Sequence, residues 1–250
     1  MISGGLRKSS IFKQSQENKP LITVVTVVRN GEKTLEETIQ SVINQTYKNI
    51  EYIIIDGGST DSTLDIIKKY EKKIDYWISE PDKGIYDAMN KGISIASGDY
   101  ISLLNSDDYY ELNTCEIIVN NINKTNADIY YGMMRIIDHY NKVIYIYGWT
   151  VNMLHQYMIA HQTCFIKKDI YKVFKYSTNY ISSGDYEYML RLNKNKRKFY
   201  FIESILANYR TGGRSDSKIG KIETINIKKK YHLINTFKYL LKLIYLYIFN

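Results

Sequence analysis

The sequence predicts an α/β fold in which helices flank a mostly parallel sheet. Its first half contains short runs of apolar and β-branched residues, separated by segments of helix length with apolar residues three and four positions apart. The short runs are apolar throughout, which is typical of strands that are buried on both faces. Helices between consecutive strands favour parallel pairing, and ligands of parallel sheets bind beyond the carboxyl ends of the strands.

Four strands and three helices are expected in the first half. The expected strands are "LITVVTVV" (21–28), "EYIIID" (51–56), "DYWIS" (75–79) and "DYISLL" (99–104). The expected helices lie in "EKTLEETIQSVINQT" (32–46), "GGSTDSTLDIIKKYEKK" (57–73) and "DKGIYDAMNKGISIASG" (82–98). Leu35, Ile39 and Val42 form one apolar stripe on the first helix, and the Ser, Thr and Asp residues before the second are favourable N-caps.

The second half is less regular and predicts a smaller, mixed region. The expected strands are "DIYYGMMRII" (128–137), "KVIYIYGW" (142–149) and "TCFIK" (163–167), and "EYMLRLNKN" (187–195) is an expected helix. The main domain is therefore divided into residues 21–110 and residues 111–225.

The two ends of the chain differ from the domain between them. Residues 1–20 contain no apolar stretch of a signal peptide, so we expect a flexible leader ending at Pro20, in a cytoplasmic protein. Residues 226–250 predict an amphipathic helix that is basic and aromatic, with an apolar run that is short for a membrane span. Such a helix suits a membrane interface, while packing onto the domain or into a homo-oligomer is the alternative.

The charge balance narrows the classes of partner. Against 26 Asp and Glu, 34 Lys and Arg give a net charge of +8, which favours anionic partners such as nucleotide phosphates, anionic lipids or nucleic acid. Nucleic acid ranks last, because the basic clusters lack an aromatic RNA-recognition signature. Cys115 and Cys164 form neither a zinc spacing nor a disulfide framework, which fits a reducing compartment.

Carboxylates lie where two of the expected strands end. "LLNSDDYY" (103–110) places Asp107 beside Asp108, and like charges this close need either water or a cation. Asp56 ends another expected strand, so we expect Asp56 and Asp107 to project into one crevice. The simpler alternatives are a solvated turn at "NSDD" and a turn-forming Asp56 that binds local backbone N–H groups.

Residues 21–110 resemble the family-two glycosyltransferases, which are nucleotide-sugar enzymes with the Rossmann-like GT-A fold. The resemblance rests on "VVTVVRNGEKTLEETIQSVINQTYKNIEYIIIDGGSTDST" followed by "DKGIYDAMNKGISIASGDYISLLNSDD", and "SGDYEYMLRL" is similar to the acceptor-side motif of that family. The most similar subgroup builds bacterial capsule, O-antigen or exopolysaccharide. The resemblance implies inverting transfer from a nucleotide diphosphate sugar, with a UDP-sugar favoured, to a glycan or lipid-linked hydroxyl. A non-catalytic nucleotide-sugar-binding subunit and a sugar-phosphate nucleotidyltransferase are the alternatives.

The resemblance also implies roles for individual residues. Asp107 would bind Mg²⁺ or Mn²⁺, with Asp108 as a further candidate ligand. Asp185 would be the catalytic base, although an N-cap is its simpler role and Glu187 is a second candidate. The expected nucleotide-sugar contacts are Val27, Val28, Arg29, Asn30, Asp56, Asp82, Lys83, Asn105 and Ser106.

Three further positions carry weaker expectations. Many relatives have Asp where this chain has Asn105, but the amide oxygen is still a ligand for a hard cation. His161 and Gln162 are candidates for holding acceptor or diphosphate, against a purely structural histidine. Arg210, with "TGGRS" (211–215), is a candidate phosphate clamp, against a solvated basic loop.

Overall fold

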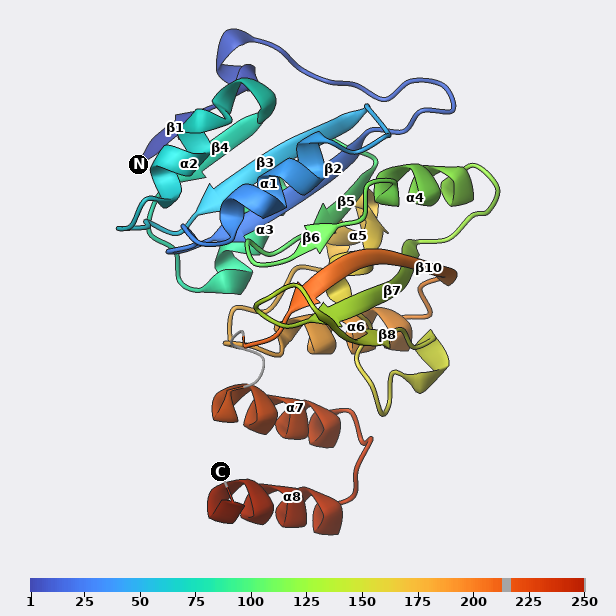
Figure 1. The fold of residues 1–250 in the computed structure, drawn as a ribbon. Coiled ribbons are helices and arrows are strands. Elements are labelled where there is room, and N and C mark those ends of the chain that lie inside the picture. The colour runs from blue at the N-terminus through green and yellow to red at the C-terminus, as the bar shows by residue number, and fades with distance from the viewer. Residues whose placement is uncertain (213–216, 250) are drawn as a thin grey trace.

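The computed structural model describes residues 1–212 and 217–249, with side chains through Leu246. In these residues a ten-stranded sheet runs through the molecule in the order β1-β4-β3-β2-β5-β9-β7-β10-β6, and β8 pairs with β7 (Figure 1). Helices lie on both sides of the sheet, which confirms the predicted α/β architecture.

The first half follows the predicted alternation of strands and helices. The strands are β2 (Ile22–Val28), β3 (Ile50–Asp56), β4 (Tyr76–Ser79) and β5 (Tyr100–Leu103). The intervening helices are α1 (Leu35–Ile43), α2 (Thr63–Lys69) with the short η2 (Glu71–Lys73), and α3 (Ile85–Ile95). β2 pairs in parallel with β3 and β5, and β3 pairs in parallel with β4. The carboxyl ends of these strands therefore meet at one edge of the sheet.

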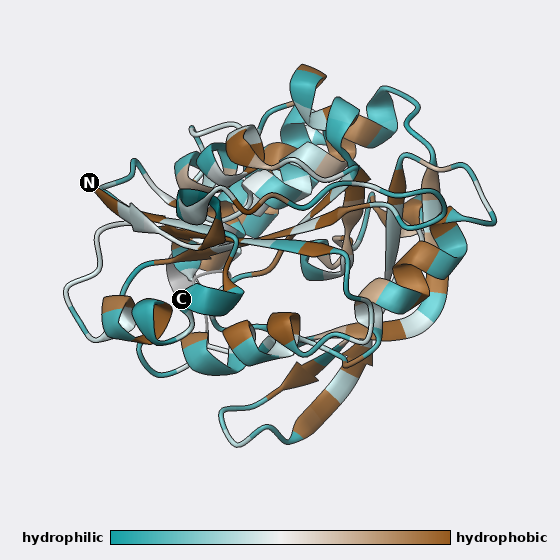
Figure 2. Cartoon of the chain, turned by 90° about the horizontal axis from the view of Figure 1, so that it is seen from above, coloured by the Kyte–Doolittle hydropathy of each residue, from teal (hydrophilic) through white to brown (hydrophobic). Residues whose placement is uncertain are grey.

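Alternate residues of β2 belong to two different cores. Val24 packs in the cluster that contains Leu35 of α1, whereas Val25 packs in the cluster that contains Met89 of α3. A strand that is covered on both faces has to be apolar on both, which explains the unbroken apolar runs. In Figure 2 the sheet is seen between helices whose hydrophobic sides face it.

The N-terminal segment is not the flexible leader that the sequence led us to expect. β1 (Ile2–Gly4) pairs antiparallel with β4 and extends the sheet at its edge, and η1 (Leu6–Ser9) follows. Arg7 forms an ion pair with buried Glu51, and Nζ of Lys13 lies 2.8 Å from a carboxylate oxygen of Asp75. These long-range contacts with two buried acids could not be inferred from the local composition of the segment.

The second half is built from pairings between strands that are distant in sequence. Its elements are β6 (Tyr109–Tyr110), α4 (Thr114–Ile122), β7 (Ile129–Ile137), β8 (Val143–Tyr147), η3 (Val151–Met153), η4 (His161–Thr163), β9 (Phe165–Lys167), α5 (Lys168–Val173), α6 (Gly184–Lys194) and β10 (Phe199–Arg210). The three predicted strands and the predicted helix are present. The long β10, which pairs in parallel with β7 and antiparallel with β6, was not predicted.

The C-terminal segment forms two helices instead of one. α7 (Lys218–Lys230) begins before residue 226 and is capped by the Ser217 side chain, and α8 (Thr236–Phe249) packs on it as a hairpin (Figure 1). Within residues 1–212 and 217–249, none of the helices combines the length and the hydropathy that a transmembrane span requires.

Candidate active site

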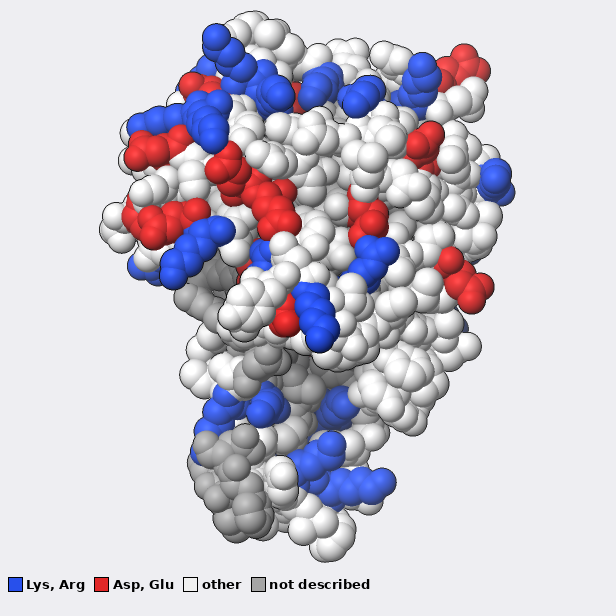
Figure 3. All heavy atoms as spheres, viewed as in Figure 1, with Lys and Arg blue, Asp and Glu red and all other residues white. Residues whose placement is uncertain are grey.

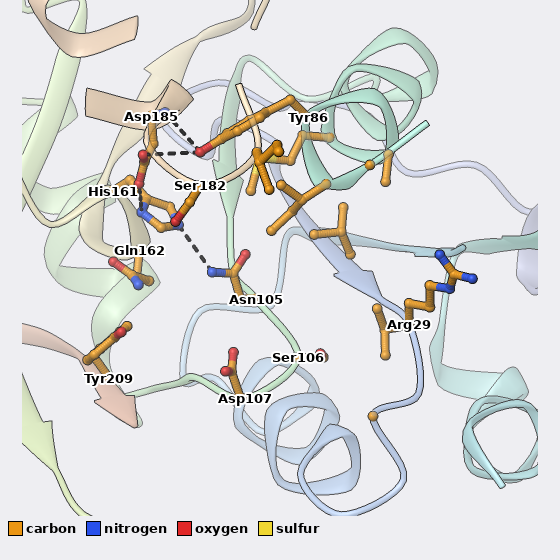
Figure 4. Close-up of a pocket in the computed structure, with 18 of the residues that line it drawn as sticks. Arg29, Tyr86, Asn105, Ser106, Asp107, His161, Gln162, Ser182, Asp185 and Tyr209 are labelled. Atoms are coloured by element: carbon orange, nitrogen blue, oxygen red, sulfur yellow. Dashed lines mark hydrogen bonds and ion pairs between the residues drawn. The ribbon is translucent and has the colours of Figure 1, made fainter. Parts of the chain in front are cut away.

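A cavity of about 460 Å³ opens beyond the carboxyl ends of β2 and β5 (Figure 4). It brings together most of the predicted site residues, which come from both halves of the chain. The predicted residues that line it are Val27, Val28, Arg29, Asn30, Asp82, Asn105, Ser106, Asp107, His161, Gln162 and Asp185. Asp56, Lys83, Asp108 and Arg210 are not among the described lining residues.

The turn after β5 presents its polar side chains to the cavity. Asn105, Ser106 and Asp107 all line it, and burial raises the pKa of the Asp107 carboxyl group. Within the described part of the chain, Oδ1 of Asn105 is buried and has no hydrogen-bond partner. The turn therefore offers the cavity a carboxylate and an unused amide oxygen.

Asp108 points away from the cavity, contrary to its predicted place beside a cation. Its side chain is fully buried, and its carboxylate accepts hydrogen bonds from Nε2 of Gln162 at 3.0 Å and from the backbone N–H of Arg210 at 3.2 Å. Burial and the neighbouring Asp107 charge raise the pKa of Asp108 to about 8. Of the adjacent carboxylates, Asp107 faces the cavity, and Asp108 braces the turn from behind.

Asp185 lies in the first turn of α6 and is held by several groups. Its Oδ2 lies 2.9 Å from Nδ1 of His161, as an ion pair, and its Oδ1 accepts from the hydroxyl of Tyr86 at 3.3 Å and the backbone N–H of Tyr186 at 2.9 Å. Nε2 of His161 lies 3.4 Å from Nδ2 of Asn105. A line of polar contacts therefore connects the turn after β5 with Asp185 (Figure 4).

The carboxylates around His161 shift the pKa of its imidazole. Burial alone would lower the pKa of His161, but the hydrogen bond and charge of Asp185, together with Asp107 and Asp108, outweigh burial and raise it. The imidazole in this position fixes the orientation of the Asp185 carboxylate through the contact at Nδ1.

Tyr86 is a site residue that the sequence analysis missed. Its hydroxyl accepts a hydrogen bond from the backbone N–H of Gly184 at 2.7 Å, and thus fixes the start of α6 as well as Asp185. A Cβ atom at Gly184 would lie 2.8 Å from the Tyr86 ring, so this close approach requires glycine. The only signal for Tyr86 was an aromatic residue in the third predicted helix, where a core position is the ordinary interpretation.

The loops after β2 and β4 form the opposite wall of the cavity, and the loop after β3 supports the first of them. Asn30 adopts a left-handed backbone conformation (φ 56°), and its N–H donates to the Ser59 hydroxyl at 2.7 Å. Asp56 is fully buried and accepts hydrogen bonds from Ser59 and from the Ser79 hydroxyl, the latter at 2.5 Å. Asp56 does not line the cavity beside Asp107, and its contact with the Ser59 N–H matches the turn-forming alternative. Lys83 contributes its backbone N–H to Asp87.

Two other predicted residues have structural partners. The Arg210 guanidinium donates to the backbone oxygen of Asp107 at 2.9 Å and pairs with Glu37 at 2.7 Å, so it braces the turn instead of facing the cavity. The "TGGRS" loop lies partly outside the described residues. Glu187 is buried against the C-terminal end of α7, where Lys230 and the Tyr231 hydroxyl contact it, so of the two acidic residues in the first turn of α6 it is Asp185 that lines the cavity.

The residues at the turn fit a divalent cation that a phosphorylated ligand helps to bind. No three His, Cys, Asp or Glu side chains of the described chain gather into a metal site of their own. Asp107 and the unpartnered Asn105 oxygen provide oxygen ligands, and Mg²⁺ and Mn²⁺ commonly combine one or two such ligands with phosphate and water. The donor set is therefore adequate only with a ligand that brings phosphate.

Comparisons with known structures match the fold. The crystal structure of S. aureus TarS 1–349 in complex with UDP-GlcNAc superposes with a TM-score of 0.70 at 16% identity, over 89% of this chain and 69% of TarS. The mannosyltransferase PcManGT of Pyrobaculum calidifontis, in complex with GDP-Man and Mn²⁺, superposes with a TM-score of 0.64 at 13% identity, over 92% of this chain and 71% of PcManGT. The overall architecture is thus that of GT-A glycosyltransferases.

Sequence comparisons match the family. An uncharacterized glycosyltransferase of Methanocaldococcus jannaschii is 29% identical over 86% of this chain and 79% of its own length. An uncharacterized glycosyltransferase of Haemophilus influenzae is 28% identical over 85% of both chains. The model of the glycosyl transferase family 2 matches residues 23–217, which include every cavity residue described above. The chain therefore belongs to glycosyl transferase family 2 and is a glycosyltransferase.

Proposed function

We propose that this enzyme transfers a sugar, with inversion, from a nucleotide diphosphate sugar to a hydroxyl group of a glycan or lipid-linked acceptor in bacterial surface polysaccharide synthesis. One observation carries the proposal: Asp185 and Asp107 line the same cavity from opposite halves of the chain. One carboxylate is thus available to the acceptor hydroxyl and the other to the donor phosphates.

Asp185 is the proposed base. It would take the proton of the acceptor hydroxyl as that oxygen attacks the anomeric carbon, and the bond to the diphosphate would break on the opposite face. Such a single displacement inverts the anomeric configuration. The contacts with His161 and Tyr86 support this role, because they fix the orientation of the Asp185 carboxylate while Asp185 still lines the cavity.

The proposed donor site is one wall of the cavity, which consists of residues 27–30, Asp82 and the turn after β5. Asn105 and Ser106 would contact the diphosphate, and Asp107 would hold a divalent cation there. When bound, Mg²⁺ or Mn²⁺ supplies positive charge that stabilises the leaving diphosphate. The Mn²⁺ and GDP-Man complex of PcManGT and the UDP-GlcNAc complex of TarS support this class of ligand, and we favour a UDP-sugar.

The acceptor side is formed by the other wall. His161 orients Asp185, and Gln162 holds the turn after β5 through Asp108, so both are proposed positioning residues. The aromatic and apolar lining on this side, which includes Tyr147, Met158 and Tyr209, suits the less polar faces of sugar rings. We place the reaction at the inner face of the cytoplasmic membrane, because the basic and apolar C-terminal helices α7 and α8 suit a membrane interface.

Calorimetric titration of UDP, GDP and dTDP, each with Mn²⁺ and with a chelator, tests the donor site. We expect metal-dependent binding of one nucleotide, with UDP the first candidate, and loss of that binding in Asp107→Ala. Binding that persists unchanged in the chelator would contradict the role of the cation. Absence of binding for all three nucleotides under both conditions would contradict the donor site itself.

A further inference from the structure

The outer side of α8 is an apolar surface. The helix packs on α7 through the side that contains Leu246, which is buried, and Tyr239, whose hydroxyl donates to Oδ1 of Asn226 at 3.0 Å. The other side, which we call the α8 ridge, has five apolar side chains that are each at least 50% exposed. They are Phe237, Leu240, Leu241, Ile244 and Tyr245.

Lysines flank the α8 ridge. Lys238 and Lys242 follow one another by one helical turn along its margin, because residues four apart share a helix face. Residues 218–246 contain seven lysines, of which Lys228 and Lys230 contact the domain, and Glu223 is their one acidic residue. On the face seen in Figure 3, the described residues in the lower part of the molecule, which α7 and α8 form, show lysines and no acidic side chains.

The carboxylate of Glu223 offsets little of this charge toward the outside. It accepts hydrogen bonds from the backbone N–H groups of Ile181, Ser182 and Ser183 at 2.7, 2.8 and 2.9 Å, so it faces the domain. The outer surface of the hairpin therefore combines an apolar strip with positive charge beside it.

This combination discriminates between the possible occupants. A second copy docked symmetrically by the same surface would bring two sets of lysines together, and like charges that face each other across an interface oppose association. A lipid surface with anionic headgroups complements both features, because the apolar strip enters the acyl boundary while the lysines contact phosphates.

We propose that the α7–α8 hairpin docks the enzyme on an anionic membrane, with the α8 ridge in the interface and the lysines on the headgroups. Helices that lie in the membrane plane need an apolar face and basic flanks, but not the length of a span. α8, from Thr236 to Phe249, satisfies this condition.

The hairpin is joined to the acceptor side of the cavity. The loop held by Glu223 includes Ile181 and Ser182, which line the cavity directly before Asp185. Nζ of Lys228 also donates to the backbone oxygen of Gln156 at 2.8 Å. Docking would thus hold the acceptor wall near the lipid surface, and this consequence rests on the proposed function.

Vesicle flotation of the full chain tests the proposal. The probes are vesicles of phosphatidylcholine alone and of phosphatidylcholine mixed with phosphatidylglycerol. We expect binding to the mixed vesicles, at least about tenfold weaker binding to the neutral ones, and weakening by salt. The double variant Leu240→Gln/Ile244→Gln should bind the mixed vesicles at least about tenfold more weakly.

A matched control exists on β8. Ile144 and Ile146 are 55% and 56% exposed, close to the 50% and 53% of Leu240 and Ile244, but they lie outside the lysine-rich hairpin. Ile144→Gln/Ile146→Gln should bind mixed vesicles like the wild type. Equal loss in both variants, or no wild-type binding to anionic vesicles, would overturn the proposal.

Light scattering and nucleotide titration on the same preparations separate the other outcomes. A dimer that disappears in Leu240→Gln/Ile244→Gln would show that the α8 ridge is an interface between copies, which overturns membrane docking. The variant should keep wild-type nucleotide affinity, because its changes lie on the outer surface of the hairpin. Absent nucleotide binding in a wild type that still binds vesicles would count against the proposed function and leave docking supported.

Discussion

The two walls of the cavity are built differently. Residues 21–110 supply theirs from successive strand–helix units, in which neighbouring strands pair in parallel and end at one edge. Residues 111–212 supply theirs from loops that pairings between distant strands, such as β10 with β7, bring together. The first wall presents turns and strand ends, whereas the second presents the buried pair of His161 and Asp185.

The chemistry therefore depends on a few side chains that cross between the walls. Tyr86 of α3 reaches across to Asp185, and Arg210 at the end of β10 reaches back to Glu37 and to the backbone of Asp107. A strand–helix wall is largely determined by local pattern, but these crossing contacts depend on the assembled fold.

The largest effect is expected on the acceptor wall. Asp185→Asn removes the proposed base while an amide of the same size remains, so the transfer rate should fall by about 100-fold or more. Nucleotide affinity should stay near the wild-type value, because Asp185 faces the acceptor side. Single-turnover kinetics and calorimetry measure the two quantities on one preparation.

Glu187→Gln is the matched control for Asp185→Asn. Glu187 lies on the same helix but is buried against Lys230 and Tyr231, away from the cavity. We expect lower stability and a transfer rate close to wild type in the folded protein. If Glu187→Gln lost transfer and Asp185→Asn kept it, the assignment of the base would be reversed.

The difference between the walls also explains what the sequence could predict. The four parallel strands and the turn with Asn105 and Asp107 follow from local patterns, since each strand and its following helix are contiguous. Which of two adjacent carboxylates faces the cavity does not follow, because Asp108 is turned inward by Gln162 and Arg210, both distant in sequence. The inward orientation of Asp56 does not follow from local pattern either, because the hydrogen bond that holds it comes from the hydroxyl of Ser79 on another strand.

The second prediction concerns the contact from the acceptor wall to the donor wall. Arg210→Met keeps an extended apolar side chain but removes the donors to the Asp107 backbone and the ion pair with Glu37. Loss of hydrogen bonds to a charged group costs about 1.5–3 kcal/mol, so we expect a lower melting temperature and about tenfold weaker metal-dependent nucleotide binding. Calorimetry measures both. An unchanged nucleotide affinity would mean that the turn keeps its shape without Arg210.

A smaller effect is expected where α7 holds the loop before Asp185. Glu223→Gln leaves one oxygen to accept hydrogen bonds from the three backbone N–H groups of residues 181–183, a net loss of about 1–2 kcal/mol. We expect transfer to slow several-fold while nucleotide affinity stays constant. Thr224→Val is the control, because it removes only the neighbouring contact with the Ser183 hydroxyl. A parallel loss of nucleotide affinity would show that the loop serves both walls.

The smallest effect is expected at the position where many relatives have Asp. Asn105→Asp places a carboxylate about where the amide now lies, with His161 Nε2 3.4 Å from the present nitrogen. The neighbouring carboxylates already raise the pKa of His161, an added carboxylate would raise it further, and a carboxylate is at least as good a ligand for a hard cation as an amide. We therefore expect transfer within about threefold of wild type and tighter Mn²⁺ binding, measured by rate assays over a Mn²⁺ titration. Inactivation comparable to that of Asp185→Asn would show that the line of contacts from residue 105 through His161 to Asp185 requires a neutral amide at position 105. The two walls would then be coupled through charge as well as through shape.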